Sequence, residues 1–387
     1  MTVDGAAGHR WRNLGATAGA VAAVLFALFD LYQWALAYAA DRFHNDFTFY
    51  FAAARIGASH GWSSIYDLRL QQIELDAMGS GITIAQLARY ISPPPVAWMA
   101  LPFTALPFPV AYWIWCAVLL LALAVTWHLA APGEGRLRLI HLAAAIGWLP
   151  VIYGLQLGQP GLLVALGVAA SYALLRRGHQ GWAGVALAPL VLKPQLAFLV
   201  PLALLAARRD RAFIAGAVTL GLLGAASAIA LGSGGIATYQ ARLNFAAGVV
   251  ANRELTIAPL LGNLAVARGV QVAVAVWALA LVYLLRRRDP EWTLVPALVG
   301  GLLASPYLHL DDFAMLGLAA WLCIRTPVAS WTWAFALAVV MAVEAEPFWG
   351  PLPIIVLELA SLVLMSVLAF RVTERDRAQP VLSAPSP

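Results

Sequence analysis

The chain has 387 residues, of which 62% are hydrophobic and only 11% are charged, and its mean hydropathy is +0.80. These values exclude a soluble globular protein and indicate a chain whose solvent is lipid. The formal net charge of +5 carries less information than the positions of the charges, and no nucleic-acid partner is expected.

The first apolar run extends from Leu14 to about Tyr38, after a short cytoplasmic tail of residues 1–13. It is too long for the apolar core of a signal peptide, and it lacks a convincing small-residue cleavage site. We therefore expect this run to remain in the protein as a signal anchor.

Apolar runs recur along the rest of the chain, and a helix needs about 20 such residues to cross a bilayer. Further spans are predicted at residues 108–130, 139–155, 160–176, 212–231, 266–285, 291–306, 310–324, 328–345 and 353–371. A re-entrant segment is predicted at 92–106, and two shorter helices within 181–207 are expected to turn near Lys193 and Pro194. The predicted fold is an all-α polytopic membrane protein with about 10 to 12 transmembrane or re-entrant helices.

Arginines concentrate in connections between alternate runs, which is typical of cytoplasmic loops. The clusters are Arg10/Arg12, Arg136/Arg138, Arg176/Arg177, Arg208/Arg209/Arg211, Arg286/Arg287/Arg288, Arg325 and Arg371/Arg375/Arg377. They predict that both termini are cytoplasmic. Residues 14–371 are expected to form a single integral-membrane domain, and residues 372–387 a disordered cytoplasmic tail.

Three stretches are predicted on the opposite, extracytoplasmic side. The first, residues 39–90, is long enough to indicate a function and is rich in charged and aromatic residues. The second, residues 232–265, contains Asn252. The third is the turn SPYLHLDD, which contains His309 and Asp312. Because all three open on the same side, we expect them to form one polar cleft.

The two cysteines, Cys116 and Cys323, both fall inside apolar runs. Neither a disulfide framework nor a cysteine-rich metal site is therefore expected. Both cysteines are interpreted as packing residues.

Several sequence segments occur in a characteristic order. They are DFTFYFAAARIGASHGWSSIYD from Asp46 to Asp67, then YISPPPVAWMALPFTALP, LGQPGLL, LKPQLAFLVPLALLAARRD, an Asn-containing loop and SPYLHLDD. In this order on a polytopic chain, they resemble glycosyltransferase family 87, whose members have the GT-C fold and use polyprenyl-phosphate sugars. The resemblance covers roughly Leu14 to Arg371. One departure is that Asn252 is followed by Arg253 and Glu254, where the family commonly has Gln and Ser, which indicates a different sugar or acceptor.

The resemblance implies a GT-C-like bundle in the plasma (inner) membrane, with its active site on the extracytoplasmic side. The implied reaction moves a hexose from a polyprenyl-phosphate donor to a glycolipid or glycan by single-displacement inversion, and mannose is the family's best-known donor sugar. The expected partners are the lipid bilayer, the lipid-linked sugar and the acceptor. No cofactor and no metal ion are expected.

Asp46 is the predicted catalytic base, because sugar transfer needs a carboxylate to accept the proton of the acceptor hydroxyl. It lies at the start of a predicted helix, where the helix dipole favours an ionised side chain. Tyr50 lies one turn further on the same face and is expected to orient it. The alternative interpretation is that Asp46 only caps the helix.

Lys193 is the only lysine of the chain and lies between two apolar segments, so it is predicted to bind the phosphate of the donor. The alternative is that its side chain reaches the membrane interface and has no ligand.

His309 and Asp312 are predicted to bind donor phosphate or sugar hydroxyls. A metal ion held by His309, Asp311, Asp312 and Asp46 is an alternative. Gln159, in the turn GQPG, is a candidate sugar contact or an ordinary turn residue. Asn252 and Tyr66 are further candidate substrate contacts, and Arg55 and Arg89 are candidate residues at the edge of the cleft.

Asp30 and Glu358 lie inside the first and last apolar runs and support a rival hypothesis. Acids within the membrane can mark an ion path, so the protein could be a transporter or flippase of lipid-linked sugars. A transporter is expected to contain internal repeats, and none is evident. A third alternative, a subunit that only scaffolds an envelope complex, leaves Asp46, Lys193 and His309 unexplained.

Overall fold

The protein is described from a computed structural model, which covers the backbone of residues 3–85, 88–326 and 331–378 and the side chains of residues 17–85, 88–326 and 334–371. All regular structure within these residues is helical. The α-helices are α1 (Val3–Ala40), α2 (Phe47–His60), α3 (Leu68–Ala77), α4 (Pro94–Ala100), α5 (Phe108–Ala130), α6 (Gly135–Ile146), α7 (Leu149–Leu157), α8 (Gly161–Arg176), α9 (Gln180–Val185), α10 (Leu199–Ala206), α11 (Asp210–Gly248), α12 (Ala258–Leu261), α13 (Leu264–Leu284), α14 (Glu291–Leu303), α15 (Ala314–Ile324), α16 (Trp331–Glu344), α17 (Glu346–Trp349) and α18 (Leu352–Ala378). The 3-10 helices are η1 (Trp62–Ser64), η2 (Leu101–Ala105), η3 (Ala188–Val191), η4 (Pro194–Leu196), η5 (Val250–Arg253) and η6 (Leu310–Phe313).

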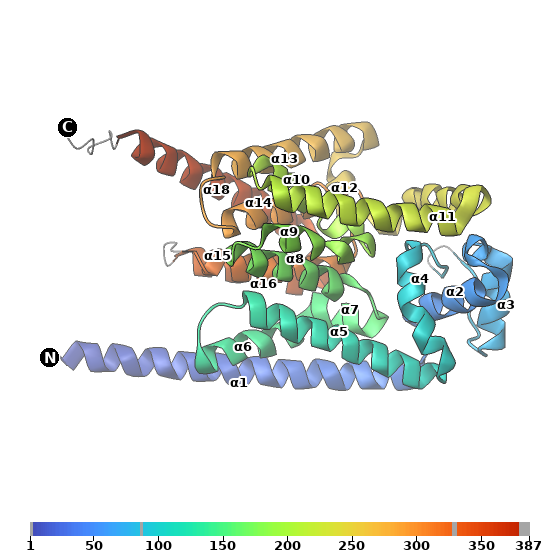
Figure 1. Ribbon diagram of the computed structural model, residues 1–387. Coiled ribbons are helices and arrows are strands. Elements are labelled where there is room, and N and C mark those ends of the chain that lie inside the picture. The colour runs from blue at the N-terminus through green and yellow to red at the C-terminus, as the bar shows by residue number, and fades with distance from the viewer. Residues whose placement is uncertain (1–2, 86–87, 327–330, 379–387) are drawn as a thin grey trace.

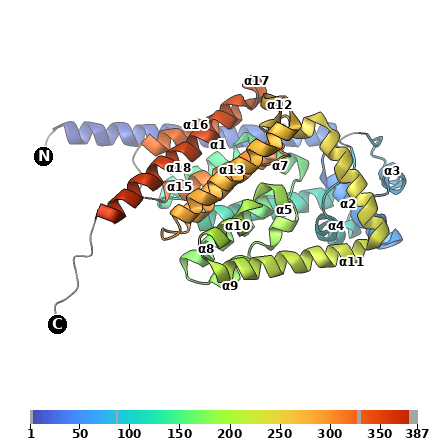
Figure 2. The same cartoon turned by 90° about the horizontal axis from the view of Figure 1, so that it is seen from above.

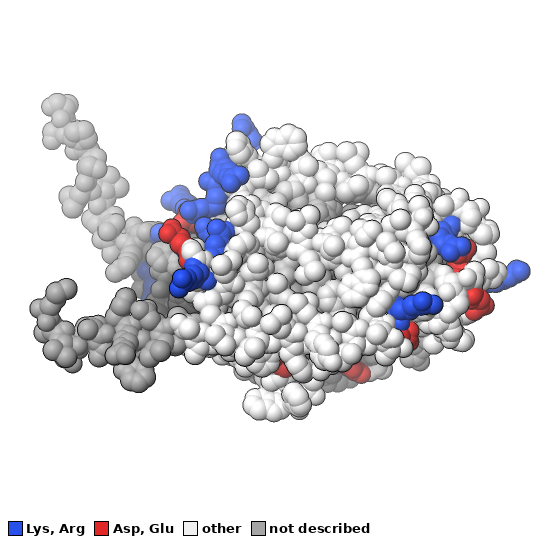
Figure 3. Space-filling view, turned by 90° about the horizontal axis from the view of Figure 1, so that it is seen from below, with Lys and Arg blue, Asp and Glu red and all other residues white. Residues whose placement is uncertain are grey.

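The helices form an elongated bundle with two distinct ends (Figure 1). Helix α1 begins and α18 ends at the same end of the bundle, which we name the arginine-rich end after Arg176, Arg208 and Arg286. Helices α2, α3 and α4 lie at the other end. On the face drawn in Figure 3, charged side chains gather at the two ends, and only a few acidic groups lie between them. This band of low charge matches the hydrocarbon layer of a bilayer.

Five of the described helices are long and apolar enough to cross a membrane, or six if the bent pair α6 and α7 counts as one span. They are joined by shorter apolar helices, among them α8, α14 and part of α16. This arrangement confirms the predicted all-α polytopic membrane protein. Helix α1 begins at Val3 and α18 continues to Ala378, so both helices extend past the ends of the predicted membrane domain at residues 14 and 371. Residues 379–387 of the predicted disordered tail lie outside the described residues.

Small residues allow the helices to approach closely, as is usual where lipid supplies no hydrophobic driving force between them. A Cβ atom on Gly184 of α9 would overlap the carbonyl oxygen of Ala212 of α11. A Cβ atom on Gly300 of α14 would overlap the Cβ of Ala278 on α13. At both places only glycine fits the observed helix separation.

The predicted single span at residues 139–155 is broken into α6 and α7, which meet at an angle of 56°. The break follows Gly147, and Pro150 occupies the first turn of α7, where its missing N–H costs nothing. The last turn of α16 stabilises the new helix start, because Glu344 Oε2 accepts a hydrogen bond of 3.0 Å from the N–H of Leu149. The bend directs the turn after Leu157 toward the end of the bundle that carries α2.

The predicted span at residues 212–231 continues as far as Gly248, with a kink at Gly232, whose φ of 61° is rarely adopted by other residues. Beyond the kink, α11 turns sharply and crosses the end of the bundle beside α2 and α4 (Figure 2). It packs closely on η1, since a Cβ atom on Gly235 would lie 3.0 Å from Ser63. The predicted loop at 232–265 is therefore largely helical.

The predicted pair of short helices within residues 181–207 is confirmed as α9, η3, η4 and α10, with the turn at Lys193 and Pro194. The predicted span at 310–324 begins with the 3-10 turn η6 before α15. Both changes of direction occur at the α2 end of the bundle, and together they bring Lys193 beside the SPYLHLDD turn.

Candidate active site

A cavity of about 710 Å³ lies at the α2 end of the bundle, which we name the cavity end. Its wall is assembled from the segment before α2, the segment before α4, the turn between α7 and α8, the Lys193 turn, the second half of α11, η5, the start of α13 and the SPYLHLDD turn. Its charged and titratable lining residues are His44, Asp46, Tyr50, Arg89, Tyr153, Lys193, Tyr239, Arg253, Arg268, Tyr307 and His309. Among the described lining residues, Asp46 is the sole carboxylate.

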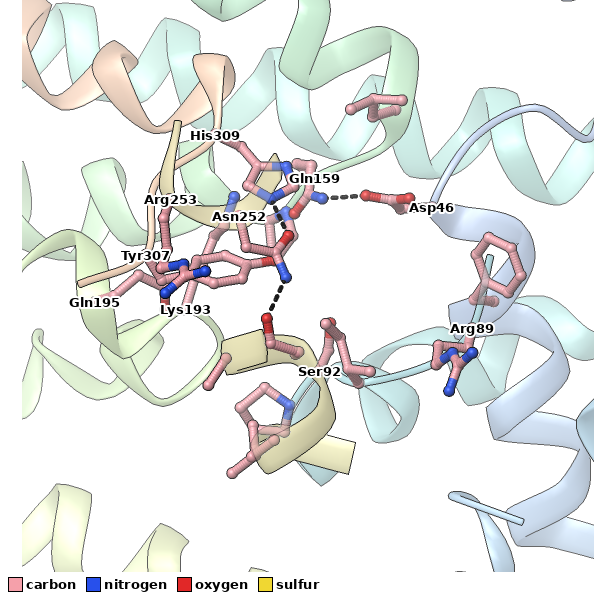
Figure 4. A pocket seen from close by; sticks show the side chains of 18 of the residues that line it. Asp46, Arg89, Ser92, Gln159, Lys193, Gln195, Asn252, Arg253, Tyr307 and His309 are labelled. Carbon is pink, nitrogen blue, oxygen red and sulfur yellow. Dashed lines mark hydrogen bonds between the residues drawn. The ribbon is translucent and has the colours of Figure 1, made fainter. Parts of the chain in front are cut away.

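Asp46 occupies the N-cap position of α2, but its side chain makes no capping hydrogen bond. Its carboxylate instead accepts a hydrogen bond from Nε2 of Gln159 (Figure 4). Oε1 of Gln159 in turn accepts a hydrogen bond of 3.1 Å from the hydroxyl of Tyr50. Tyr50 thus orients Asp46 through Gln159 rather than directly. The interpretation of Asp46 as only a helix cap does not fit this geometry.

The turn that carries Gln159 is fixed from both sides. Gly158 has a φ of 71°, and a Cβ atom there would lie 2.9 Å from the Cβ of Phe47. The indole of Trp115 donates a hydrogen bond of 2.8 Å to the Gly158 carbonyl, and the N–H of Asp46 donates one of 2.9 Å to the carbonyl of Leu157. These contacts set the position of Asp46 relative to Gln159 through rigid neighbours.

Burial raises the pKa of Asp46 above its usual range, and the charge of Lys193 and the hydrogen bond from Gln159 offset this effect only in part. A carboxylate with a raised pKa accepts a proton more readily than an ordinary one. The environment of Asp46 therefore suits a general base.

Lys193 lines the cavity, but its ammonium is already paired. Its Nζ lies 2.6 Å from Asp311 Oδ2 and 2.5 Å from Asp312 Oδ1, and Lys193 is only 7% exposed. Two carboxylates face one ammonium, and burial raises the pKa of Asp312 to about 7. Because the positive charge of Lys193 is balanced locally, Lys193 fits the predicted role of principal phosphate cation less well than an arginine without a counter-ion.

The imidazole ring of His309 is held by Asn252. Its Nε2 lies 3.0 Å from Asn252 Oδ1, and the amide of Asn252 donates to the carbonyl of Ala246 at 2.8 Å, so Oδ1 faces the ring and Nε2 is the donor. Burial lowers the pKa of His309, which favours the neutral form of the ring. A neutral ring that donates from Nε2 presents Nδ1 as an acceptor, which suits a sugar hydroxyl rather than a phosphate.

Two predicted substrate contacts do not reach the cavity. Tyr66 is fully buried, donates a hydrogen bond of 2.7 Å to the Ser92 carbonyl and stacks on Tyr90 and Tyr239. Asp312 is also fully buried; besides Lys193, it contacts the N–H of His309 at 2.8 Å. Both residues support the cavity wall from behind.

The remaining predicted residues divide between the cavity and its surroundings. Asn252 lines the cavity, but its amide is engaged with His309 and Ala246. Arg89 lines the cavity, whereas Arg55 pairs with Glu74 at 3.0 Å outside it. Asp30 and Glu358, which motivated the ion-path hypothesis, do not line the cavity.

The polar wall residues that sequence reasoning missed include Tyr153, Arg268 and Tyr307. Arg268 is the third residue of the predicted span at 266–285, and its charge so close to the end of an apolar run was the available signal. Tyr307 stacks on His309 with ring centroids 4.9 Å apart, and its place in SPYLHLDD was the signal in that case. No group of three or more His, Cys, Asp or Glu side chains suited to a metal ion occurs among the described residues.

Fold and cavity define a multi-pass helical membrane protein with a positively charged cavity at one end and, among the described residues, a single carboxylate on the cavity wall. The sequence profile of glycosyltransferase family 87 matches residues 90–306, more than half of the chain. The chain belongs to this family and is a membrane glycosyltransferase. No curated protein and no solved structure matches it. The matched residues include Gln159, Lys193 and Asn252, and the fold adds Asp46 and His309 from outside the match.

Proposed function

We propose that the protein transfers a sugar from a polyprenyl-phosphate donor to a glycolipid or glycan acceptor, with inversion at the anomeric carbon. The reaction takes place in the plasma membrane, with the cavity end on the extracytoplasmic side and both termini in the cytoplasm. The arginine-rich end supports this orientation, since cytoplasmic loops retain arginine.

The observation that carries the proposal is the isolation of Asp46. It is the sole carboxylate among the described residues of a cavity wall that also carries unpaired arginines. Within the described residues, no carboxylate lies within 4.0 Å of Arg89, Arg253 or Arg268. One base opposite several free cations suits a reaction in which a hydroxyl loses a proton and a phosphate departs.

In the proposed step, the acceptor oxygen attacks the anomeric carbon of the donor sugar while the bond from that carbon to the phosphate oxygen breaks. The hydroxyl proton passes to Asp46, and polyprenyl phosphate leaves with the bonding electrons. A phosphate is a fair leaving group, so the step needs no general acid. Gln159 and Tyr50 hold the Asp46 carboxylate in one orientation throughout.

Arg253 and Arg268 are the proposed cations for the donor phosphate. Arg253 lies on η5 beside Tyr307, on the side of the opening opposite Asp46 (Figure 4), and Arg268 lies in the second turn of α13. The adjoining wall between α11 and α13 is apolar, and its residues are Leu243, Ala246, Ala247, Leu264 and Ala267. This wall suits the first isoprene units of a lipid tail.

His309 and Gln195 are the proposed sugar contacts on the cavity wall. The neutral ring of His309 presents Nδ1 to a hydroxyl, and Gln195 offers an amide that can donate and accept. Sugar recognition by such neutral groups is compatible with more than one hexose, among them mannose, the family's best-known donor sugar.

The test is sugar transfer by protein purified into lipid vesicles, with a panel of radiolabelled polyprenyl-phosphate sugars and membrane-extracted acceptors. We expect transfer with at least one donor, an inverted anomeric configuration in the product by NMR, and unchanged transfer after a chelator is added. Retention of configuration would contradict the single-displacement step. If no donor is used but labelled lipid moves between the leaflets, the proposal fails and the flippase hypothesis replaces it.

A further inference from the structure

The cavity wall carries more positive charge than one donor phosphate requires. A phosphodiester donor brings a single negative charge, and Arg253 and Arg268 on the wall already suffice to bind it. Arg89 adds a further guanidinium to the wall, and Arg242, which does not line the cavity, lies close enough to Arg89 for the two charges to interact. Two like charges that interact, with no carboxylate paired to either among the described residues, favour binding of an anion.

The guanidinium of Arg89 is held through its Nε and through one face, and its terminal nitrogens have no hydrogen-bond partner among the described residues. The Nε donates a hydrogen bond of 2.8 Å to the carbonyl of Ala85, and the Cζ lies 4.0 Å from the ring centre of Phe245 on α11. Arg242 is three residues before Phe245 and therefore lies on the same face of α11. The Nε of Arg242 is buried and has no hydrogen-bond partner among the described residues.

Arg89 and Asp46 lie on the same side of the opening, and Arg253 lies on the other (Figure 4). The segment of Arg89 is joined to the Asp46 side through its neighbour Tyr90, which packs edge-on against Tyr50 with ring centroids 6.2 Å apart. In an inverting displacement, the acceptor and the departing phosphate occupy opposite faces of the anomeric carbon. A cation on the side of the base is therefore placed to meet the acceptor rather than the departing phosphate.

We infer that Arg89 and Arg242 form a binding site for an acidic group of the acceptor, either a phosphate or a carboxylate. This inference rests on the proposed function, because Asp46 identifies the acceptor side. Arg89 presents its guanidinium edge to two oxygens of the anion, and Arg242 adds a second charge from α11. The acceptor is accordingly an acidic glycolipid or glycan, and the acidic group lies near the hydroxyl that receives the sugar.

The test is direct binding to the full chain in nanodiscs of neutral phosphatidylcholine, with three matched probes. These are hexyl glucoside, hexyl glucuronide and hexyl glucoside 6-phosphate. We expect at least one acidic probe to bind about tenfold more tightly than the neutral one, as a charge-assisted hydrogen bond allows. Preference for the phosphate alone identifies a phosphorylated acceptor, and preference for both acidic probes identifies a site for either anion.

Three variants locate the effect. The double variant Arg89→Gln with Arg242→Gln is expected to lose the preference, whereas Arg253→Gln keeps it. Arg55→Gln is the matched control, because Arg55 is also at the cavity end but is paired with Glu74. Equal binding of all probes, no binding of any probe, or a preference that survives the double variant would overturn the inference.

The sugar-transfer assay separates this inference from the proposed function. If the wild type transfers no sugar but still binds an acidic probe more tightly than the neutral one, the result would count against the proposed reaction and would leave the anion site in place. Transfer to neutral and acidic acceptors at equal rates in the wild type would remove the anion site and leave the reaction standing.

Discussion

Both ends of the bundle contain a buried carboxylate that is paired across helices. At the arginine-rich end, Glu291 is 3% exposed, accepts a hydrogen bond of 2.7 Å from the Tyr172 hydroxyl and lies 3.7 Å from Arg176. At the cavity end, Lys193 joins Asp311 and Asp312 at distances of 2.6 and 2.5 Å. The two clusters are alike in that each holds a buried carboxylate with a cationic partner.

The Glu291 and Lys193 clusters differ in the cavities that lie beside them. A hollow of about 350 Å³ at the arginine-rich end is lined by Arg208, Asp210 and Arg211 among others, but not by Glu291 or Tyr172. Lys193, in contrast, lines the large cavity next to Asp46 and the unpaired arginines. Buried charge therefore marks a site only where a cavity reaches neighbouring groups that have no partner. The Glu291 cluster joins α8 to α14 and serves the fold.

The largest effect on activity is expected at the cavity end, from Asp46→Asn. The substitution keeps the size of the side chain but removes the base, so kcat should fall by about 10²- to 10⁴-fold. Donor binding should remain, because the proposed phosphate cations are unchanged. The measurement is single-turnover transfer together with equilibrium binding of the labelled donor. A variant with full activity would remove Asp46 from the reaction.

The next largest effect is expected on stability, from Lys193→Met. The variant leaves Asp311 and Asp312 buried without a counter-charge, which costs about 3–5 kcal/mol. The apparent unfolding temperature in detergent should fall strongly. Adding Asp311→Asn and Asp312→Asn to Lys193→Met removes all three charges, and this triple variant is expected to recover most of the loss. Failure of the triple variant to recover would mean that the charges are not the cause.

The sequence predicted the bundle well, because arginine placement and apolar run length are local signals that persist in the fold. It placed the turn at Lys193 and Pro194 correctly and missed the break after Gly147. The hydrophobic pattern runs through that break without interruption, although Pro150 was a signal for a helix start. The last turn of α16, far along the chain, satisfies the new helix start.

Partners within the site could not be predicted in the same way. Asp46 and Gln159 are 113 positions apart, and Lys193 and Asp311 are 118 apart. No periodicity relates such pairs, so the sequence singled out the residues as candidates but not their pairing. Tyr66 illustrates the converse, since an aromatic residue in a long loop predicted a substrate contact and the fold buried it in a stack.

A smaller effect is expected from Gln159→Leu, which removes the hydrogen bond to the Asp46 carboxylate. A hydrogen bond to a charged group contributes about 1.5–3 kcal/mol, so kcat should fall by about 10- to 100-fold with little change in donor KM. Tyr50→Phe, one step further from the carboxylate, should cost less. If Gln159→Leu raises only the donor KM, Gln159 contacts sugar and does not position the base.

The pH profile provides a separate test of Asp46. Because burial raises its pKa above the usual value of 3.8, activity should fall by about tenfold per pH unit below a midpoint that is higher than 3.8. Unfolding linked to the titration of Asp46 cannot cause this loss of activity at low pH. A group whose pKa is raised in the folded state stabilises the fold at low pH, and that stability is lost as the pH rises through the raised pKa. Gln159→Leu should move the midpoint upward, since the lost hydrogen bond favours the charged form.

The smallest effect on activity is expected at the arginine-rich end, from Glu291→Gln. The variant weakens the contacts with Arg176 and keeps a hydrogen-bond acceptor for Tyr172, so stability should fall by about 1–3 kcal/mol. Sugar transfer below the unfolding temperature should stay within about twofold of wild type. Neither described cavity is lined by Glu291, and a packing change far from Asp46 adds little to the activation barrier of sugar transfer. Thermal unfolding and transfer, measured on one preparation, separate the two quantities. A large loss of transfer in a folded variant would show that the two buried clusters are coupled and would end the contrast between the ends of the bundle.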